Sequence, residues 1–209
     1  MTLPPEDAKA ALREEVRARR RARSDYECAD VEAQLAVRVG VIPEVAELVA
    51  DPDSGCVAAY ASYGTEPGTG RMRDLFELVG VRVLLPVIRS DGGLDFAWDS
   101  GTVALGHVSP GIPEPTGPVV ASGMHGLVSL GCRVVLAPGL AVDLAGDRLG
   151  KAGGYYDRLF AELDDVDPAL RPVLVAVVHD DDVVVSVPTG AHDRRVDAVL
   201  TPARYLPLG

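Results

Sequence analysis

Apolar positions in the first quarter of the chain recur with helical spacing. Residues of this kind stand four apart over about 5–23, which predicts an amphipathic helix with a narrow apolar stripe. Ser24 and Glu27 form the S-x-x-E pattern of a capping box, so a second helix is expected to run from there towards residue 39. A proline at the start of 43–50 predicts a third, shorter helix.

From residue 55 onward the pattern changes to short, continuous apolar runs separated by turns. Such runs are typical of buried strands, and helical stretches alternate with them. The predicted strands cover 55–61, 81–88, 94–98, 133–137, 172–178 and 198–201, with a short candidate at 183–187. The predicted helices cover 69–78 and 154–163. The residues S-D-G-G at 90–93 predict a hairpin, and the segment 107–118 is predicted to be a loop.

This alternation indicates an α/β fold, since parallel sheets bury both faces beneath helices. We expect residues 1–209 to form a single three-layer domain, with a mainly parallel central sheet flanked by helices and a pair of helices at the N-terminus. Ligands of such sheets bind beyond the carboxyl ends of the strands. The loops 62–70 and 138–154 both follow predicted strands, so they are the first places to look for a site.

Charge and composition exclude several classes of protein. Twenty basic and 31 acidic residues leave a net charge of −11, which argues against a general nucleic-acid-binding protein. The three cysteines are far apart and lack C-x-x-C spacing, so neither a disulfide scaffold nor a thiolate zinc site is expected. No apolar run approaches the roughly 20 residues of a membrane helix, and the first residues do not form a signal peptide. We expect a soluble cytoplasmic protein, a monomer, with no membrane partner.

The segment 134–160 carries the candidate chemistry. Four glycines lie just before a predicted helix, together with Arg148 and Lys151, and Asp157 falls one turn into that helix. Backbone amides at a helix start, two cations and a carboxylate suit a nucleotide phosphate with Mg²⁺. The spacing is not that of a P-loop, and Ala152 stands where that motif has serine or threonine. The residues themselves leave two interpretations open: a phosphate site, or a long surface turn with solvated charges.

The string GDRLGKAGGYYDR resembles the signature of the 5-formyltetrahydrofolate cyclo-ligase family, approximately R-L-G-x-G-x-G-Y-Y-D. Ala152 departs from it, standing where the middle glycine is usual, and alanine tolerates positive φ poorly. The resemblance implies that ATP and Mg²⁺ are used. The ATP-binding residues that it implies are Lys9, Arg13, Arg148, Leu149, Gly150, Lys151, Ala152, Gly153, Gly154, Tyr155 and Tyr156.

Three further segments resemble the same family in the same order. Lys9 and Arg13 match its K-x-x-x-R element, although a solvated basic helix is the alternative, and that alternative is favoured for the arginines over 17–23. Glu66 matches a glutamate that contacts the pterin ring, and a helix-start acid is the alternative. The stretch 188–197 matches a C-terminal element with a functional acid, for which Asp193 is preferred and Asp197 is held in reserve. The run 180–182 is interpreted as a solvated hairpin turn.

The resemblance implies an ATP-dependent cyclo-ligase that converts 5-formyltetrahydrofolate to 5,10-methenyltetrahydrofolate with release of ADP and phosphate, through phosphorylation of the formyl oxygen. Arg148 and Asp157 are the expected catalytic residues. Glu66, Ala61 and Tyr155 are expected to bind the reduced folate, and Asp157 and Asp193 to bind the metal. Two alternatives stay open: a non-catalytic relative that binds folate or nucleotide, and a phosphate-binding enzyme such as a sugar-phosphate isomerase.

Overall fold

A computed structural model describes residues 4–106, 108–109, 111–190 and 193–208. Its helices are α1 (Pro5–Arg21), α2 (Asp25–Arg38), α3 (Pro43–Ala50), α4 (Gly70–Leu78), α5 (Gly123–Ser129) and α6 (Tyr155–Ala161). Short 3₁₀ turns cover Val39–Val41, Pro52–Ser54, Glu162–Asp165, Pro168–Leu170 and Asp180–Asp182. The predicted capping box of α2 is confirmed, because the Ser24 hydroxyl accepts from the amide of Glu27 and the Glu27 carboxylate accepts from the amide of Ser24.

The strands form one large sheet and two small ones. They are β1 (Cys56–Ala58), β2 (Val83–Ile88), β3 (Leu94–Trp98), β4 (Val103–Leu105), β5 (Pro113–Pro115), β6 (Val119–Ser122), β7 (Cys132–Pro138), β8 (Ala141–Asp143), β9 (Arg148–Leu149), β10 (Val173–Val177), β11 (Val183–Val184), β12 (Ala198–Leu200) and β13 (Tyr205–Pro207). The large sheet has the order β13-β12-β10-β7-β1-β2-β3-β6. Its centre, from β12 to β2, is parallel, and its outer pairs are antiparallel.

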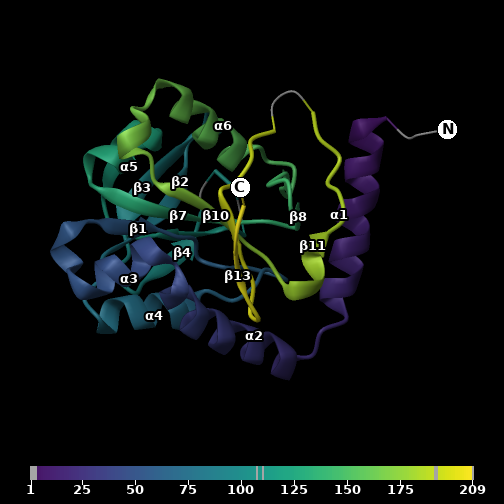
Figure 1. The fold of residues 1–209 in the computed structure, drawn as a ribbon, viewed down its shortest axis with the longest axis horizontal. Helices are drawn as coiled ribbons and strands as arrows, with labels where there is room; N and C mark the ends of the chain where they lie inside the picture. The colour runs from purple at the N-terminus through teal and green to yellow at the C-terminus, as the bar shows by residue number, and fades with distance from the viewer. Residues whose placement is uncertain (1–3, 107, 110, 191–192, 209) are drawn as a thin grey trace.

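Helices cover both faces of this sheet (Figure 1). On one face α2, α3 and α4 bury an apolar cluster that includes Leu35, Leu48 and Phe76. On the other face α5 and α6 bury a second cluster around Met124 and Phe160. The α/β class, the three layers and the parallel centre are therefore confirmed.

Helix α1 stands apart from these layers, at the right of Figure 1. It packs through Val16 against Leu140, Ala141 and Leu149, which belong to or adjoin the small sheet of β11, β8 and β9. The two N-terminal helices are thus both present, but α2 joins the main core whereas α1 lies over the edge of the domain where β7 and β10 end.

Several details of the sequence interpretation are wrong. Residues 107–118 were expected to be loop, but β5 pairs there with β4, and the segment 138–154 contains the β8–β9 hairpin. Strands β6 and β13 and helix α5 were not predicted. These elements span only three to seven residues, which is too short for a clear hydrophobic period to appear in the sequence. Residues 107 and 110 lie outside the described part.

The arginines after Arg17 and the aspartates at 180–182 were expected to be solvated, and this is wrong for two of them. The side chains of Arg20 and Asp182 are both fully buried, and Arg20 Nη2 lies 2.7 Å from Asp182 Oδ2. Arg19 Nη2 lies 2.6 Å from the other oxygen of Asp182. A charged pair becomes compatible with burial only when the fold brings its members together, which no local pattern announces.

Candidate active site

The first wall of the site is the loop that follows β1, residues 59–69. Ser62 and Thr69 of this loop form two reciprocal hydrogen bonds. The amide of Ser62 donates to Thr69 Oγ1 at 3.1 Å, and the amide of Thr69 donates to Ser62 Oγ at 3.0 Å. Thr69 Oγ1 also donates to the carbonyl of Tyr60 at 2.6 Å. These bonds hold a compact turn at the carboxyl edge of the sheet, and Glu66 lies within that turn.

The second wall is the glycine-rich loop 150–154, which leads from β9 into α6. Gly154 has φ of +66°, and a Cβ at this position would lie 2.9 Å from Arg158 Nη1. Ala152 has φ of +90° and is the only non-glycine residue with a positive φ in the described part of the chain. The loop therefore follows the course that glycine favours at residue 152, and the alanine there is strained.

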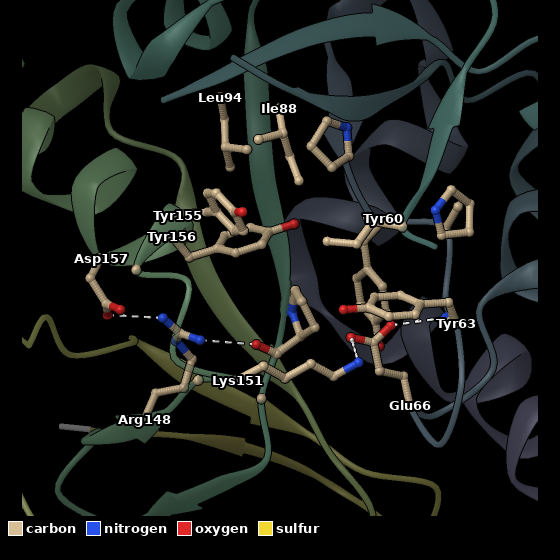
Figure 2. A pocket seen from close by; sticks show the side chains of 18 residues that line it. Tyr60, Tyr63, Glu66, Ile88, Leu94, Arg148, Lys151, Tyr155, Tyr156 and Asp157 are labelled. Atoms are coloured by element: carbon tan, nitrogen blue, oxygen red, sulfur yellow. Dashed lines mark hydrogen bonds and ion pairs between the residues drawn. The ribbon is translucent and has the colours of Figure 1, made fainter. Parts of the chain in front are cut away.

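Between these loops lies a pocket with mostly apolar walls, here called the aromatic pocket (Figure 2). Tyr155 and Tyr156 stand on one side of it, and Tyr60 on the other. Its other apolar lining residues are Ala61, Tyr63, Pro86, Ile88, Leu94, Ile112, Pro113 and Pro138. The hydroxyl of Tyr156 is buried and has no hydrogen-bond partner among the described residues, and burial raises the pKa of Tyr156. It is therefore a protonated hydroxyl available to a ligand.

The carboxylate of Glu66 lies in the aromatic pocket, where only 3% of its side chain is exposed. Its Oε1 is 2.8 Å from Lys151 Nζ, and its Oε2 accepts from the amide of Tyr63 at 3.0 Å. Lys151 Nζ also lies 3.6 Å from the centroid of the Tyr63 ring. A buried carboxylate is costly without a partner, so Lys151 serves here as the counter-ion of Glu66.

Arg148 and Asp157 form a wall shared by the aromatic pocket and a second cavity. Arg148 Nη2 donates to Asp157 Oδ1 at 2.9 Å, and Nη1 donates to the carbonyl of Pro138 at 3.0 Å. The rings of Tyr156 and Phe160 lie 5.8 and 5.7 Å from the guanidinium carbon. The side chain of Arg148 is 2% exposed, and its buried Nε has no hydrogen-bond partner in the part of the chain that the structure describes.

The second cavity, here called the cationic cavity, has a volume of about 540 Å³. Helix α1 contributes Lys9, whose Nζ is 2.6 Å from Asp193 Oδ2, and Arg13, whose Nε donates to the carbonyl of Gly150 at 3.0 Å. Burial alone would raise the pKa of Asp193, but the bond from Lys9 and the amide of Gly190 lower it. The i, i+4 spacing predicted to place both cations on one face of a helix thus brings them to one cavity.

The predicted site residues are divided between the aromatic pocket and the cationic cavity. The cationic cavity is lined by the predicted ATP-binding residues Lys9, Arg13, Arg148, Leu149, Gly150, Ala152 and Gly154, and by the predicted metal ligands Asp157 and Asp193. The aromatic pocket is lined by the predicted folate-binding residues Glu66, Ala61 and Tyr155, and also by Lys151 and Tyr156, which were assigned to ATP. Gly153 is not among the residues lining either space.

Asp197, the reserve choice, lies elsewhere. Its Oδ2 accepts from the amide of Leu174 at 2.8 Å, at the start of β10, so it joins that strand to the C-terminal segment. Asp193 is the acid of this stretch that faces the cationic cavity. Residues 191–192, which belong to the same stretch, lie outside the described part.

Sequence reasoning missed two arginines of the cationic cavity. Arg158 and Arg194 line it, and each directly follows an acid that was predicted, Asp157 and Asp193. Their position next to predicted ligands was a usable signal. The apolar lining from β2 and β3 carried none, because Pro86, Ile88 and Leu94 look like ordinary strand residues.

The acidic side chains of the cationic cavity bear on whether it can hold a divalent cation. No three His, Cys, Asp or Glu side chains gather into a metal site in the described part of the chain. Mg²⁺, however, is held by one or two carboxylates together with substrate phosphates and water. Asp157 and Asp193 line one cavity with several cations, so the residues present fit Mg²⁺ bound jointly with a polyphosphate.

Among the described residues, none of the helices combines the length and the apolar composition of a membrane-spanning segment.

The comparisons with known proteins agree on one family. The model of the 5-formyltetrahydrofolate cyclo-ligase family matches residues 5–202. A 5-formyltetrahydrofolate cyclo-ligase of Mycolicibacterium smegmatis is 36% identical over 154 residues, covering 71% of this chain and 74% of its own.

Two solved structures share the fold. The 5,10-methenyltetrahydrofolate synthetase of Aquifex aeolicus is 25% identical, with a TM-score of 0.73 and coverage of 96% of this chain and 92% of its own. A 5,10-methenyltetrahydrofolate synthetase of Mycoplasma pneumoniae is 17% identical with a TM-score of 0.65, covers 93% of this chain and 98% of its own, and is similar in fold. The sequence match over 5–202, the two adjoining cavities and the shared fold agree, and the chain belongs to the 5-formyltetrahydrofolate cyclo-ligase family.

Proposed function

We propose that this protein converts 5-formyltetrahydrofolate and ATP to 5,10-methenyltetrahydrofolate, ADP and phosphate, in the presence of Mg²⁺. The observation that carries the proposal is the shared wall of the two cavities. Arg148, Gly150, Gly154 and Asp157 line both the aromatic pocket and the cationic cavity. A ring system bound on one side and a polyphosphate bound on the other would meet at these residues.

The aromatic pocket suits the folate. The Glu66 carboxylate can accept two hydrogen bonds from the amino-pyrimidinone edge of the pterin, which is the geometry that carboxylates favour with paired N–H donors. Tyr155 and Ala61 offer ring and methyl surface to the fused rings, and the unpartnered Tyr156 hydroxyl is available to a carbonyl or formyl oxygen.

The cationic cavity suits ATP. Lys9 and Arg13 on α1, Arg148 on β9 and the amides of the loop 150–154 would neutralise phosphate oxygens, and Asp157 and Asp193 would hold Mg²⁺. The metal, when bound, supplies charge neutralisation for phosphoryl transfer. The task of the protein is mainly to align the reacting groups and to exclude water.

In the proposed reaction the formyl oxygen takes the γ-phosphoryl group of ATP, and ADP leaves. N10 then bonds to the activated formyl carbon, the carbon–oxygen bond breaks, phosphate departs and the N10 proton is released. Phosphorylation turns a poor leaving group into a good one. No covalent bond to a protein side chain is required.

The direct test mixes the purified protein with 5-formyltetrahydrofolate, Mg²⁺ and ATP, and follows the near-ultraviolet absorbance of the methenyl product. Growth of that band only when ATP is present would support the proposal. A flat trace with folate still binding would favour a non-catalytic relative. A flat trace without folate binding, but with binding of a phosphorylated ligand, would favour a different phosphate-binding enzyme.

Asp157→Ala tests the shared wall. We expect kcat to fall by roughly 10²-fold or more, because a carboxylate at the phosphoryl-transfer site is lost while the fold is kept. The same absorbance assay measures kcat, and circular dichroism checks the fold. Asp165→Ala, an exposed aspartate after the same helix, is the matched control. Equal activity of the two variants would contradict the role of Asp157.

A further inference from the structure

Lys151 lines the aromatic pocket, at the point of the loop where the two binding spaces adjoin. Ala152 lines the cationic cavity, and Gly150 lines both spaces. The Lys151 side chain crosses to Glu66, as Figure 2 shows. It is 31% exposed, while the carboxylate it meets is 3% exposed. One flexible cation thus sits at the boundary between the two binding spaces.

Both oxygens of Glu66 are already used. Oε1 pairs with Lys151 and Oε2 accepts from the amide of Tyr63. Each carboxylate oxygen has two acceptor sites, so one remains on each, but a ligand donor at Oε1 must approach an oxygen that Lys151 Nζ already contacts. Because the carboxylate is buried, it also cannot be left without a partner during the exchange. A ring that donates to Oε1 therefore competes with Lys151 for that oxygen.

The size of the aromatic pocket supports the same conclusion. Its cavity measures about 90 Å³, whereas small-molecule pockets typically measure roughly 300–1,000 Å³. The lysine chain is flexible and carries a compact charge, and its contacts among the described residues are one ion pair and the face of Tyr63. It is the lining side chain best able to leave.

We infer that Lys151 is a specificity and positioning residue that closes the empty folate pocket and is released towards the cationic cavity when the ring of the reduced folate takes Glu66. This inference rests on the proposed function. Release adds one positive charge beside the phosphates, so binding of folate strengthens binding of ATP. Because such coupling is reciprocal, ATP strengthens binding of folate by the same factor.

The chain offers an unusually clean probe of this step, because Lys9 and Lys151 are its only lysines. In protein labelled with ¹³C-lysine, the side-chain methylenes next to the amines give two sets of signals, which Lys151→Met assigns. The signal of Lys151 is expected to lie upfield, since its amine stands over the Tyr63 ring. Adding 5-formyltetrahydrofolate without ATP should move it back towards the position of a free lysine.

The coupling is measured by calorimetry with a non-hydrolysable ATP analogue and Mg²⁺, with and without saturating 5-formyltetrahydrofolate. In the native protein folate should tighten the analogue about 5-fold or more, the lower range of allosteric couplings. In Lys151→Met the ratio of the two dissociation constants should fall to about 1. Arg133→Met removes another glutamate-paired cation, exposed on the surface beside Glu47, and should keep the native ratio.

The outcomes separate the two proposals. Folate that binds while the Lys151 signal stays upfield would overturn the inference and leave the proposed function intact, as would full coupling in Lys151→Met. Failure of the native protein to bind folate at all would refute the proposed function, and the inference with it. The spectrum of the native protein with and without folate tests the release of Lys151 even if the Lys151→Met variant is unstable.

Discussion

At the scale of single residues, Ala152 gives the sharpest prediction. It holds φ of +90° in a loop where its backbone conformation suits glycine. Relief of this strain should outweigh the greater freedom of glycine in the unfolded chain, so Ala152→Gly should raise the free energy of unfolding by about 0.5–1 kcal/mol. Urea denaturation measures the change, with the slope checked for constancy.

The control has the opposite sign. Ala10 lies exposed within α1, where glycine is expected to cost roughly 1 kcal/mol relative to alanine. If Ala152→Gly and Ala10→Gly both destabilised the protein, the strain at residue 152 would not be stored in the folded state in solution.

At the scale of elements, the attachment of α1 depends on charge more than on apolar packing. The residues that α1 buries are Lys9, Val16 and Arg20. Besides its pairing with Asp182, Arg20 Nη2 donates to the carbonyls of Gly139 and Leu140 at 2.7 and 3.2 Å. One guanidinium therefore joins the helix that carries Lys9 to the strand ends that form the site.

Arg20→Met should cost about 3–5 kcal/mol of stability, because it leaves the buried Asp182 with a lost partner. Since α1 carries Lys9 and Arg13, affinity for the ATP analogue should fall more than affinity for folate. Arg21→Met, at an exposed neighbour that pairs with Glu14, should change neither by much. Unfolding in urea and calorimetry measure both effects, and identical behaviour of the two variants would refute the role of Arg20.

At the scale of the whole molecule, one histidine should govern stability in mild acid. His179 is buried, and burial together with Arg20 and Arg23 lowers its pKa to about 4. In the unfolded chain the histidine pKa is near 6.5, so between about pH 4 and 6.5 the unfolded chain binds a proton at residue 179 and the folded chain does not. Stability should be full above pH 6.5 and fall as the pH drops from about 6.5 to 4.

Urea midpoints between pH 4.5 and 7.5 measure this dependence. His179→Gln should flatten it, because the side chain no longer takes up a proton on unfolding. His125→Gln, at an exposed histidine of α5, should retain it. A native-like slope in His179→Gln would assign the acid sensitivity to other groups.

The sequence by itself determined the layers of this molecule and pointed to many of the side chains that line its two cavities. Continuous apolar runs predicted the buried strands, the caps and prolines predicted α2 and α3, and the string at 148–157 identified the family. These features are local: periodicity, turn chemistry and a motif depend on neighbours in the chain. The residues expected at the folate also proved to line one pocket, because Glu66, Ala61 and Tyr155 all follow carboxyl ends of strands or begin α6.

Only the tertiary structure decided which side chains face which cavity and which charges are buried. Lys151 and Ala152 are neighbours in the motif but lie on opposite sides of the loop, and the 3% exposure of Glu66 depends on Lys151 arriving from another segment. Arg20 and Asp182 are 162 residues apart and look solvated in isolation. Burial of a charge depends on the partner that the fold brings to it, and that partner is not encoded by local pattern.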